Sequence, residues 1–219
     1  MSGTRGTRRD RCRARRLPRR SRAPASAWEC RGASLVEALT TLAILAILAL
    51  AGAPSFVRWR QQQQVEGAVR HLELLFTRVC VAAVASGRTH AVQFDADGAD
   101  LHWVAVVDGD GDGVTRADLA AHVDVPLEAW SSLAMLFPGV EGGRPPAVPT
   151  VLGGAADRGG LAFGRSEIVS CSPAGGARSG TLYLRSRGGD AAALRIYGPT
   201  GRITLWWWNG SVAGWDELR

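Results

Sequence analysis

The sequence predicts an α+β protein in which one long N-terminal helix packs against an antiparallel β-sheet. Two observations lead to this prediction. Residues 33–88 are rich in apolar residues and glutamine, and in their second half apolar residues recur every three or four positions, as on one face of a helix. From residue 89 onward, short apolar runs alternate with Gly- and Asp-rich turns, which is typical of antiparallel strands. A helix followed by a series of strands is the order of an α+β architecture.

The first 32 residues form a basic arm. They hold eleven arginines and two acids, a formal charge of +9, whereas residues 33–219 hold fifteen arginines and eighteen acids, a formal charge of −3. Such an arm can bind nucleic acid or anionic lipid, act as a twin-arginine export signal, or hold the N-terminus in the cytoplasm ahead of a membrane span. The third interpretation needs no further assumption. A start codon assigned too far upstream would also explain part of the arm.

Residues 33–57 predict a transmembrane helix. Residues 38–57 carry no charge, and at about 1.5 Å per residue they span about 30 Å, the thickness of a bilayer core. Pro54 near the far end would remove one backbone hydrogen bond and kink the helix. A cleaved signal peptide is the rival interpretation, because residues 51–53 are small. Cleavage after Ala53 would, however, leave Pro54 as the first residue, which signal peptidases tolerate poorly.

An acid lies at the start of this apolar segment. Glu37 follows the run Arg31-Gly32-Ala33-Ser34-Leu35-Val36, and a carboxylate at the centre of a bilayer costs about 2.5–3.5 kcal/mol, so it needs a partner. The arrangement resembles the prepilin leader of type IV pilins and type II secretion pseudopilins, although Ala33 stands where that family usually has phenylalanine. The resemblance implies that a membrane peptidase cuts between Gly32 and Ala33 and methylates the new amine of Ala33. It also implies that Glu37 neutralises the terminal amine of a neighbouring subunit during filament assembly.

The pattern of residues 58–88 predicts that the helix continues beyond the membrane as an amphipathic helix. Trp59 between two arginines is typical of an anchor at the membrane interface. The apolar residues that follow at helical spacing are Val65, Val69, Leu72, Leu75, Phe76, Val79 and Ala83. We expect this face to pack against the sheet and the helix to end near Ser86-Gly87, where glycine can adopt the left-handed cap conformation.

Residues 89–219 predict the β-sheet domain. The expected strands cover residues 89–94, 101–107, 122–126, 133–137, 161–163, 181–186, 192–197 and 202–208, and residues 138–160 are expected to form a loop. The element order, together with Trp103, an Asp-Gly-rich hairpin, Gly180-Thr181-Leu182 and Pro199-Thr200-Gly201-Arg202-Ile203, is similar to the minor pseudopilin family called GspH or FimT.

This resemblance covers residues 32–208 and implies the pilin fold, with residues 1–32 removed as a leader. It also implies a single-pass protein of the cell inner membrane, with a cytoplasmic N-terminus and a periplasmic C-terminal domain. The expected partners are other pilins or pseudopilins and the prepilin peptidase, in a type II secretion system or a type IV pilus. Neither a nucleophile context, nor metal-ligand spacing among the four histidines, nor a phosphate-binding loop is present in the sequence, so we expect no enzymatic activity.

Two of the four cysteines, Cys80 and Cys171, lie beyond the expected span. In an exported domain they would meet an oxidising compartment and could form a disulfide. The chain-entropy model gives such a long loop about 4–5 kcal/mol of stabilisation. Alternatively, Cys80 packs as a small buried apolar residue on the helix.

Residues 108–113 read Asp-Gly-Asp-Gly-Asp-Gly, which is similar to the start of a calcium loop. Acids occupy the first, third and fifth positions and glycine the sixth, but the twelfth is Leu119 instead of a glutamate, and Asp118 falls one residue short. The alternative is a β-hairpin turn, in which Asp-Gly is a favoured pair. The candidate metal ligands are therefore Asp108, Asp110, Asp112 and Asp118, and calcium is the only cofactor that the sequence suggests.

A second functional hypothesis concerns residues 201–208. Some FimT-type pilins bind DNA in natural transformation through a Gly-Arg-x-Arg turn, and this chain keeps Gly201 and Arg202 but has Thr204 at the fourth position. Three tryptophans follow at 206–208 and could stack on bases, or contribute to the core and to a subunit contact. The charge of −3 beyond the basic arm speaks against phosphate binding.

Overall fold

The structure is a computed structural model that describes residues 34–153, 159–210 and 212–218, without the side chains of residues 51–54 and 152. The chain divides into two compact units, residues 1–46 and 47–219. Helix α1 (Leu35–Ser86) is followed by antiparallel strands in two sheets, which confirms the α+β class. The single sheet expected from the sequence is thus two sheets, and both belong to the second unit.

The second half of α1 forms as predicted. All seven apolar residues expected on its packing face are buried. The helix ends at Ser86, and Gly87 adopts φ 70°, the left-handed conformation that glycine tolerates at the end of a helix. The N–H of Gly87 donates to the carbonyl of Ala83 at 3.1 Å, which satisfies one of the last helical carbonyls.

The first sheet has the order β3-β2-β1-β7, with a short strand β4 also paired to β2. Its central hairpin joins β1 and β2 in antiparallel register, from His90 opposite Val107 to Asp97 opposite Asp100. The strands are β1 (His90–Asp97), β2 (Asp100–Val107), β3 (Val125–Pro126), β4 (Ser131–Ser132) and β7 (Ile168–Cys171).

The second sheet has the order β11-β10-β9-β8-β5, with β6 also paired to β8. Its three longest strands, β8, β9 and β10, follow one another as an antiparallel meander. The strands are β5 (Val140–Gly142), β6 (Leu161–Ala162), β8 (Gly180–Ser186), β9 (Ala191–Tyr197), β10 (Arg202–Asn209) and β11 (Gly214–Leu218).

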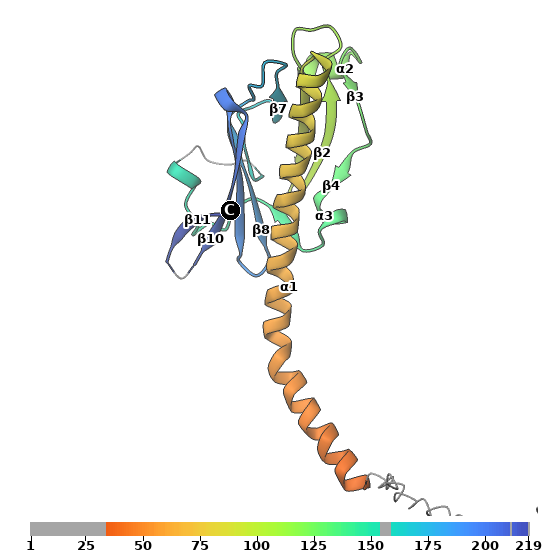
Figure 1. The fold of residues 1–219 in the computed structure, drawn as a ribbon, viewed down its shortest axis with the longest axis vertical. Coiled ribbons are helices and arrows are strands. Elements are labelled where there is room, and N and C mark those ends of the chain that lie inside the picture. The colour runs from red at the N-terminus through yellow and green to blue at the C-terminus, as the bar shows by residue number, and fades with distance from the viewer. Residues whose placement is uncertain (1–33, 154–158, 211, 219) are drawn as a thin grey trace, which may run out of the picture. The chain divides into compact units, whose positions relative to one another are not determined.

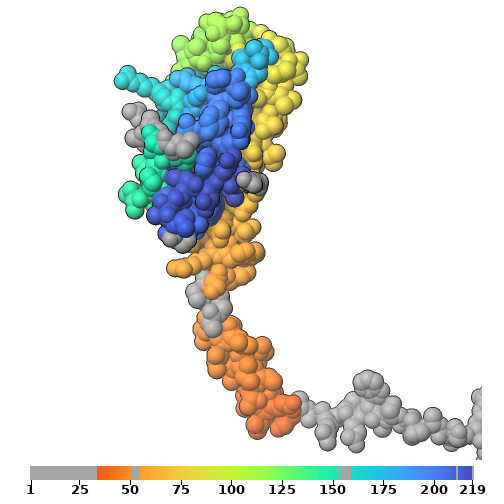
Figure 2. Space-filling model, turned by 60° about the vertical axis from the view of Figure 1, so that its left-hand side comes forward, coloured from red at the N-terminus to blue at the C-terminus, as the bar shows by residue number. Residues whose placement is uncertain are grey.

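One core joins the second half of α1 to both sheets. Figure 1 shows this part of α1 between the blue strands of the second sheet and the green strands of the first. In Figure 2 the blue C-terminal strands lie beside the yellow part of α1 on one face of the molecule. The largest core side chains that the sheets contribute are Phe94, Leu101 and Trp103 from the first, and Leu182, Leu184 and Leu194 from the second. Two sheets therefore seal the apolar face of one helix.

Several elements differ from the sequence expectation. Residues 133–137, expected to form a strand, contain helix α3 (Leu133–Leu136), because the Ser132 side chain accepts a hydrogen bond from the N–H of Met135 and caps it. Helix α2 (Arg116–Ala120) and strands β4, β5, β7 and β11 were not expected. Strand β5 and the 3₁₀ turn η1 (Val151–Gly153) lie within the expected loop of residues 138–160.

Candidate functional site

The first half of α1 exposes large apolar side chains. Those at least 57% exposed are Leu35, Val36, Leu39, Leu42, Ile44, Leu45, Ile47, Leu48 and Leu50. Because successive helical positions are about 100° apart, these nine residues together point to all sides of the helix. The described part of the chain therefore leaves this apolar surface uncovered.

Among the described residues, no single helix is long and apolar enough to cross a membrane, whereas the bent pair Leu35–Leu50 and Ser55–Ser86 could do so by length and composition alone. The break between the two members covers residues 51–54, where the sequence has Gly52 and Pro54.

Glu37 lies in the first turn of α1. An acid at this end of a helix interacts favourably with the helix dipole, which is a structural reason for its position. Its backbone carbonyl accepts a hydrogen bond from the Thr40 side chain at 2.9 Å. Within the described residues, however, its carboxylate has neither a hydrogen bond nor an ion pair. The expected cleavage residues, Gly32 and Ala33, lie outside the described residues.

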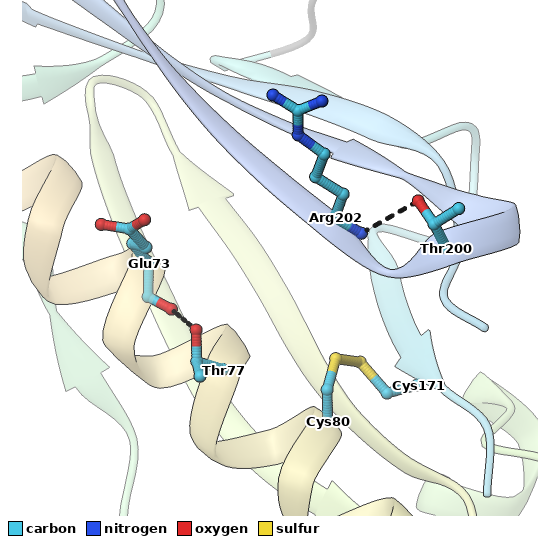
Figure 3. Close-up of a disulfide and its surroundings, with 6 residues drawn as sticks. All are labelled: Glu73, Thr77, Cys80, Cys171, Thr200 and Arg202. Carbon is cyan, nitrogen blue, oxygen red and sulfur yellow. Dashed lines mark hydrogen bonds between the residues drawn. A yellow bond between two sulfur atoms is a disulfide. The ribbon is translucent and has the colours of Figure 1, made fainter. Parts of the chain in front are cut away.

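A disulfide joins Cys80 of α1 to Cys171, the last residue of β7 (Figure 3). The two Cα atoms are 5.0 Å apart and the residues are 91 positions apart in the chain. Cys171 is buried, and Cys80 is partly buried at the edge of the same core. The bond ties the second half of α1 to the first sheet, and disulfides of this kind persist mainly in oxidising compartments.

A buried histidine, which no sequence motif indicated, lies beside the disulfide. His90 is directly opposite Cys171 in the pairing of β1 with β7. Its Nε2 lies 2.9 Å from the Ser86 hydroxyl, while its buried Nδ1 has no hydrogen-bond partner among the described residues. Burial, and then the nearby charge of Arg88, lower the pKa of His90 below 6.5. Both effects favour the neutral form of the imidazole.

The acidic loop lies between β2 and α2, in the long connection that joins β2 to its antiparallel partner β3. The carboxylates of Asp108, Asp110 and Asp112 lie within 4.8 Å of one another and could hold a metal ion. Burial would raise the pKa of Asp108, but three backbone N–H donors, those of Asp110, Gly111 and Gly113, outweigh burial and lower it. The charge of Asp110 raises the pKa of the exposed Asp112. Hydrogen bonds therefore stabilise the ionised form of Asp108, while repulsion from Asp110 disfavours the ionised form of Asp112.

Asp118, the fourth candidate ligand, lies outside this group. Its carboxylate accepts a hydrogen bond from the Thr115 hydroxyl at 2.5 Å, and its N–H donates to the same hydroxyl at 3.2 Å. This is a helix cap at the start of α2. Asp124 was missed by the sequence analysis, although it is buried and accepts hydrogen bonds from the N–H groups of Gly109 and Thr115. Asp124 thus closes the loop from the other side.

The turn at Gly201 and Arg202 has a structural explanation. Gly201 adopts φ 62°, and a side chain there would place Cβ 2.8 Å from the carbonyl oxygen of Gly175. Arg202 begins β10, is 68% exposed and lies 3.4 Å from the Glu217 carboxylate of β11. Figure 3 shows its guanidinium pointing away from Cys80 and Cys171. Thr204, at the position of the second arginine in the DNA-binding motif, is buried.

The three tryptophans of β10 divide between the two faces of the sheet, as strand alternation predicts. Trp207 packs against the main core. Trp206 joins a smaller cluster with Tyr183 and Trp215 on the other face, and Trp208 stacks edge-on against Trp215 with ring centres 5.6 Å apart. All three are therefore partly covered by the chain itself.

Neither a protein-family model, nor a curated protein, nor a solved structure matches the chain.

Proposed function

We propose that the chain is a minor pseudopilin or pilin, a membrane-anchored subunit that joins a filament of a type II secretion system or a type IV pilus. The observation that carries this proposal is the first half of α1. Apolar side chains point to all sides of this helix, and its first turn holds Glu37, whose carboxylate has no partner among the described residues. A surface of this kind needs lipid before assembly and neighbouring helices after it.

In the proposed assembly, prepilin peptidase cuts between Gly32 and Ala33 on the cytoplasmic side and methylates the new amine. The amine of one subunit then meets the Glu37 carboxylate of another. Both groups would lie in an environment that solvates charge poorly, where an unpaired charge is costly and an opposite charge is strongly attractive. The pairing therefore favours insertion of each subunit beside its neighbour and sets their relative height.

In this proposal, residues 58–219 form a domain on the periplasmic side of the inner membrane. The Cys80–Cys171 disulfide supports an oxidising location for this domain, since such bonds are rare in the cytosol. The basic arm of residues 1–32 supports a cytoplasmic N-terminus by the positive-inside rule.

The proposal is tested by neutralising Glu37 without changing its size. In cells that make the filament, we expect Glu37→Gln to insert in the membrane and to be trimmed normally, but to be lost from the sheared filament fraction by at least about tenfold. Glu37→Asp should retain part of the incorporation. Glu66→Gln is the matched control, because Glu66 lies on the same helix in an exposed pair with Arg70. Normal incorporation of Glu37→Gln would contradict the proposal.

The proposed function requires no cofactor. The group of Asp108, Asp110 and Asp112 could nevertheless hold a metal ion, and its calcium-loop pattern makes calcium the ion to test. A complete calcium loop would add a bidentate carboxylate at its twelfth position, where this chain has Leu119. We therefore expect titration calorimetry with calcium to show at most weak binding, which Asp110→Asn/Asp112→Asn abolishes.

DNA binding in natural transformation is the alternative function. The exposure of Arg202 supports it, whereas the ion pair of Arg202 with Glu217 and the formal charge of −3 for residues 33–219 oppose it. A gel-shift assay at low salt with the full chain, repeated with Arg202→Ala, decides the matter. We expect no retardation that depends on Arg202.

A further inference from the structure

The outward face of the first sheet is hollowed on both sides of Trp130. One hollow of about 360 Å³ is lined by Gln93, Val104, Leu119 and Pro126, among others, and the adjoining one of about 510 Å³ by Asp95, Asp97 and His102. Trp130 lines both hollows. Together they form a groove, called the Trp130 groove below. One end combines apolar side chains with Gln93, Arg116 and His122, and the other end is acidic.

Strand register explains why these residues share one face. In the β1–β2 pairing, Gln93 lies opposite Val104 and Asp95 opposite His102, while the alternate residues point into the core. Trp130 immediately precedes β4, whose Ser132 pairs with His102 of β2. By alternation, Trp130 therefore projects on the same face as His102.

The tryptophan is left without a partner. Trp130 is 50% exposed, and within the described parts of the chain its indole N–H has no hydrogen bond and its ring no aromatic contact. Tryptophan is enriched among the residues that dominate protein–protein binding, so an exposed ring between two hollows is a candidate for the centre of such a contact.

The charge that remains free in the groove is negative. Asp95 and Asp97 are exposed and have neither a hydrogen bond nor an ion pair among the described residues. The neighbouring Asp100, by contrast, is held by Ser132 and His102. Among the described residues that line the groove, the arginine is Arg116, which is already paired with Glu167 at 2.8 Å. A partner that fits must therefore bring positive charge.

We propose that the Trp130 groove docks a basic segment of a partner protein. An arginine or lysine of that segment lies on the Trp130 ring and points its charge at Asp95 and Asp97, and an adjacent apolar side chain fills the hollow beside Val104 and Leu119. A cation over a tryptophan face gains electrostatic attraction from the ring, and flanking carboxylates add to it. This docking does not depend on the filament role proposed above.

The test uses the full chain in detergent micelles and a fluorescein-labelled peptide that alternates leucine and arginine. Binding is followed by fluorescence anisotropy with a chelator present. We expect saturable binding that weakens about tenfold in Trp130→Ala and about fivefold in Asp95→Asn/Asp97→Asn. A peptide with the neutral isostere citrulline in place of arginine should bind at least about tenfold more weakly.

The matched control is Asp110→Asn/Asp112→Asn, which removes the same two charges from a different loop and should leave peptide binding within about twofold of the unaltered protein. Circular dichroism checks that each variant folds, and the charge variants keep the test valid should Trp130→Ala unfold. The proposal is overturned if the arginine peptide does not bind, if the citrulline peptide binds equally well, or if the control and groove variants lose equal affinity.

Discussion

The two halves of α1 are both apolar, yet they differ in what covers them. In residues 65–83 the seven apolar residues predicted at helical spacing occupy one face, and two sheets of the same chain bury it, while Leu74 and Val81 lie on the exposed side. In residues 35–50 apolar residues occupy all faces, and each large apolar side chain remains more than half exposed. The spacing of apolar residues along one helix thus distinguishes a surface that the chain seals by itself from one that needs cover from outside.

Among the changes to the half of α1 that the two sheets bury, loss of the disulfide should have the largest effect on stability. Cys80→Ser/Cys171→Ser opens a link that spans 91 positions, and the chain-entropy model predicts a loss of about 4–5 kcal/mol in the free energy of unfolding. Guanidinium denaturation followed by tryptophan fluorescence measures it. An unchanged denaturation midpoint would show that the link contributes nothing to the attachment of α1 to β7.

Truncating one large side chain in each half compares the two regions directly. Phe76→Ala removes a fully buried ring and should cost about 3–5 kcal/mol of unfolding free energy. Leu45→Ala, at a position 60% exposed, should leave that free energy unchanged to within about 0.5 kcal/mol. The same denaturation experiment on both variants checks the contrast. Equal losses would mean that residues 35–50 pack within the folded domain.

The buried His90 should make the stability of the folded domain depend on pH. Because the pKa of His90 is lowered in the folded state, the unfolded chain takes up a proton near pH 6.5 that the folded chain resists. The resulting stability is present above pH 6.5 and is lost as the pH falls below it. We expect His90→Leu to flatten the dependence of the denaturation midpoint on pH between 7.5 and about 5.5, measured against the unaltered protein. An identical slope in both proteins would rule out His90 as its source.

The smallest expected effect concerns an exposed ion pair on the same half of α1. Arg78 donates to both carboxylate oxygens of Glu128 at 2.9 Å, but its side chain is 61% exposed. Arg78→Ala should therefore lower the free energy of unfolding by only about 0.2–1 kcal/mol, and less at high salt. A loss as large as that of Phe76→Ala would mean that charge, and not apolar burial, holds this half.

How far the sequence alone could predict the structure also differs between regions. The packing face of α1 and its end at Ser86 were predictable, because both depend on local periodicity and a glycine cap. Helix α3 was mistaken for a strand, since in four residues the two periods cannot be distinguished and the Ser132 cap decides. The division into two sheets and the position of Asp124 depend on contacts between distant segments, which no local pattern encodes.

The candidate sites also divide into features that a local sequence pattern predicts and features that depend on contacts between distant segments. The acidic group at residues 108–112 was visible as a motif, whereas the engagement of Asp118 in a helix cap required the structure. The Trp130 groove had no sequence signal at all, because it is assembled from β1, β2, α2 and the segment before β4.

The central claim is that residues 35–50 stay on the mature protein and are covered by lipid and by other subunits. Mass spectrometry of the mature N-terminus, in cells that carry a prepilin peptidase, tests this most directly. We predict a chain that begins at Ala33 with one methyl group on its amine. A mature chain that begins beyond Ala53 would mean that the exposed apolar half is discarded as a signal peptide, and the claim would be wrong.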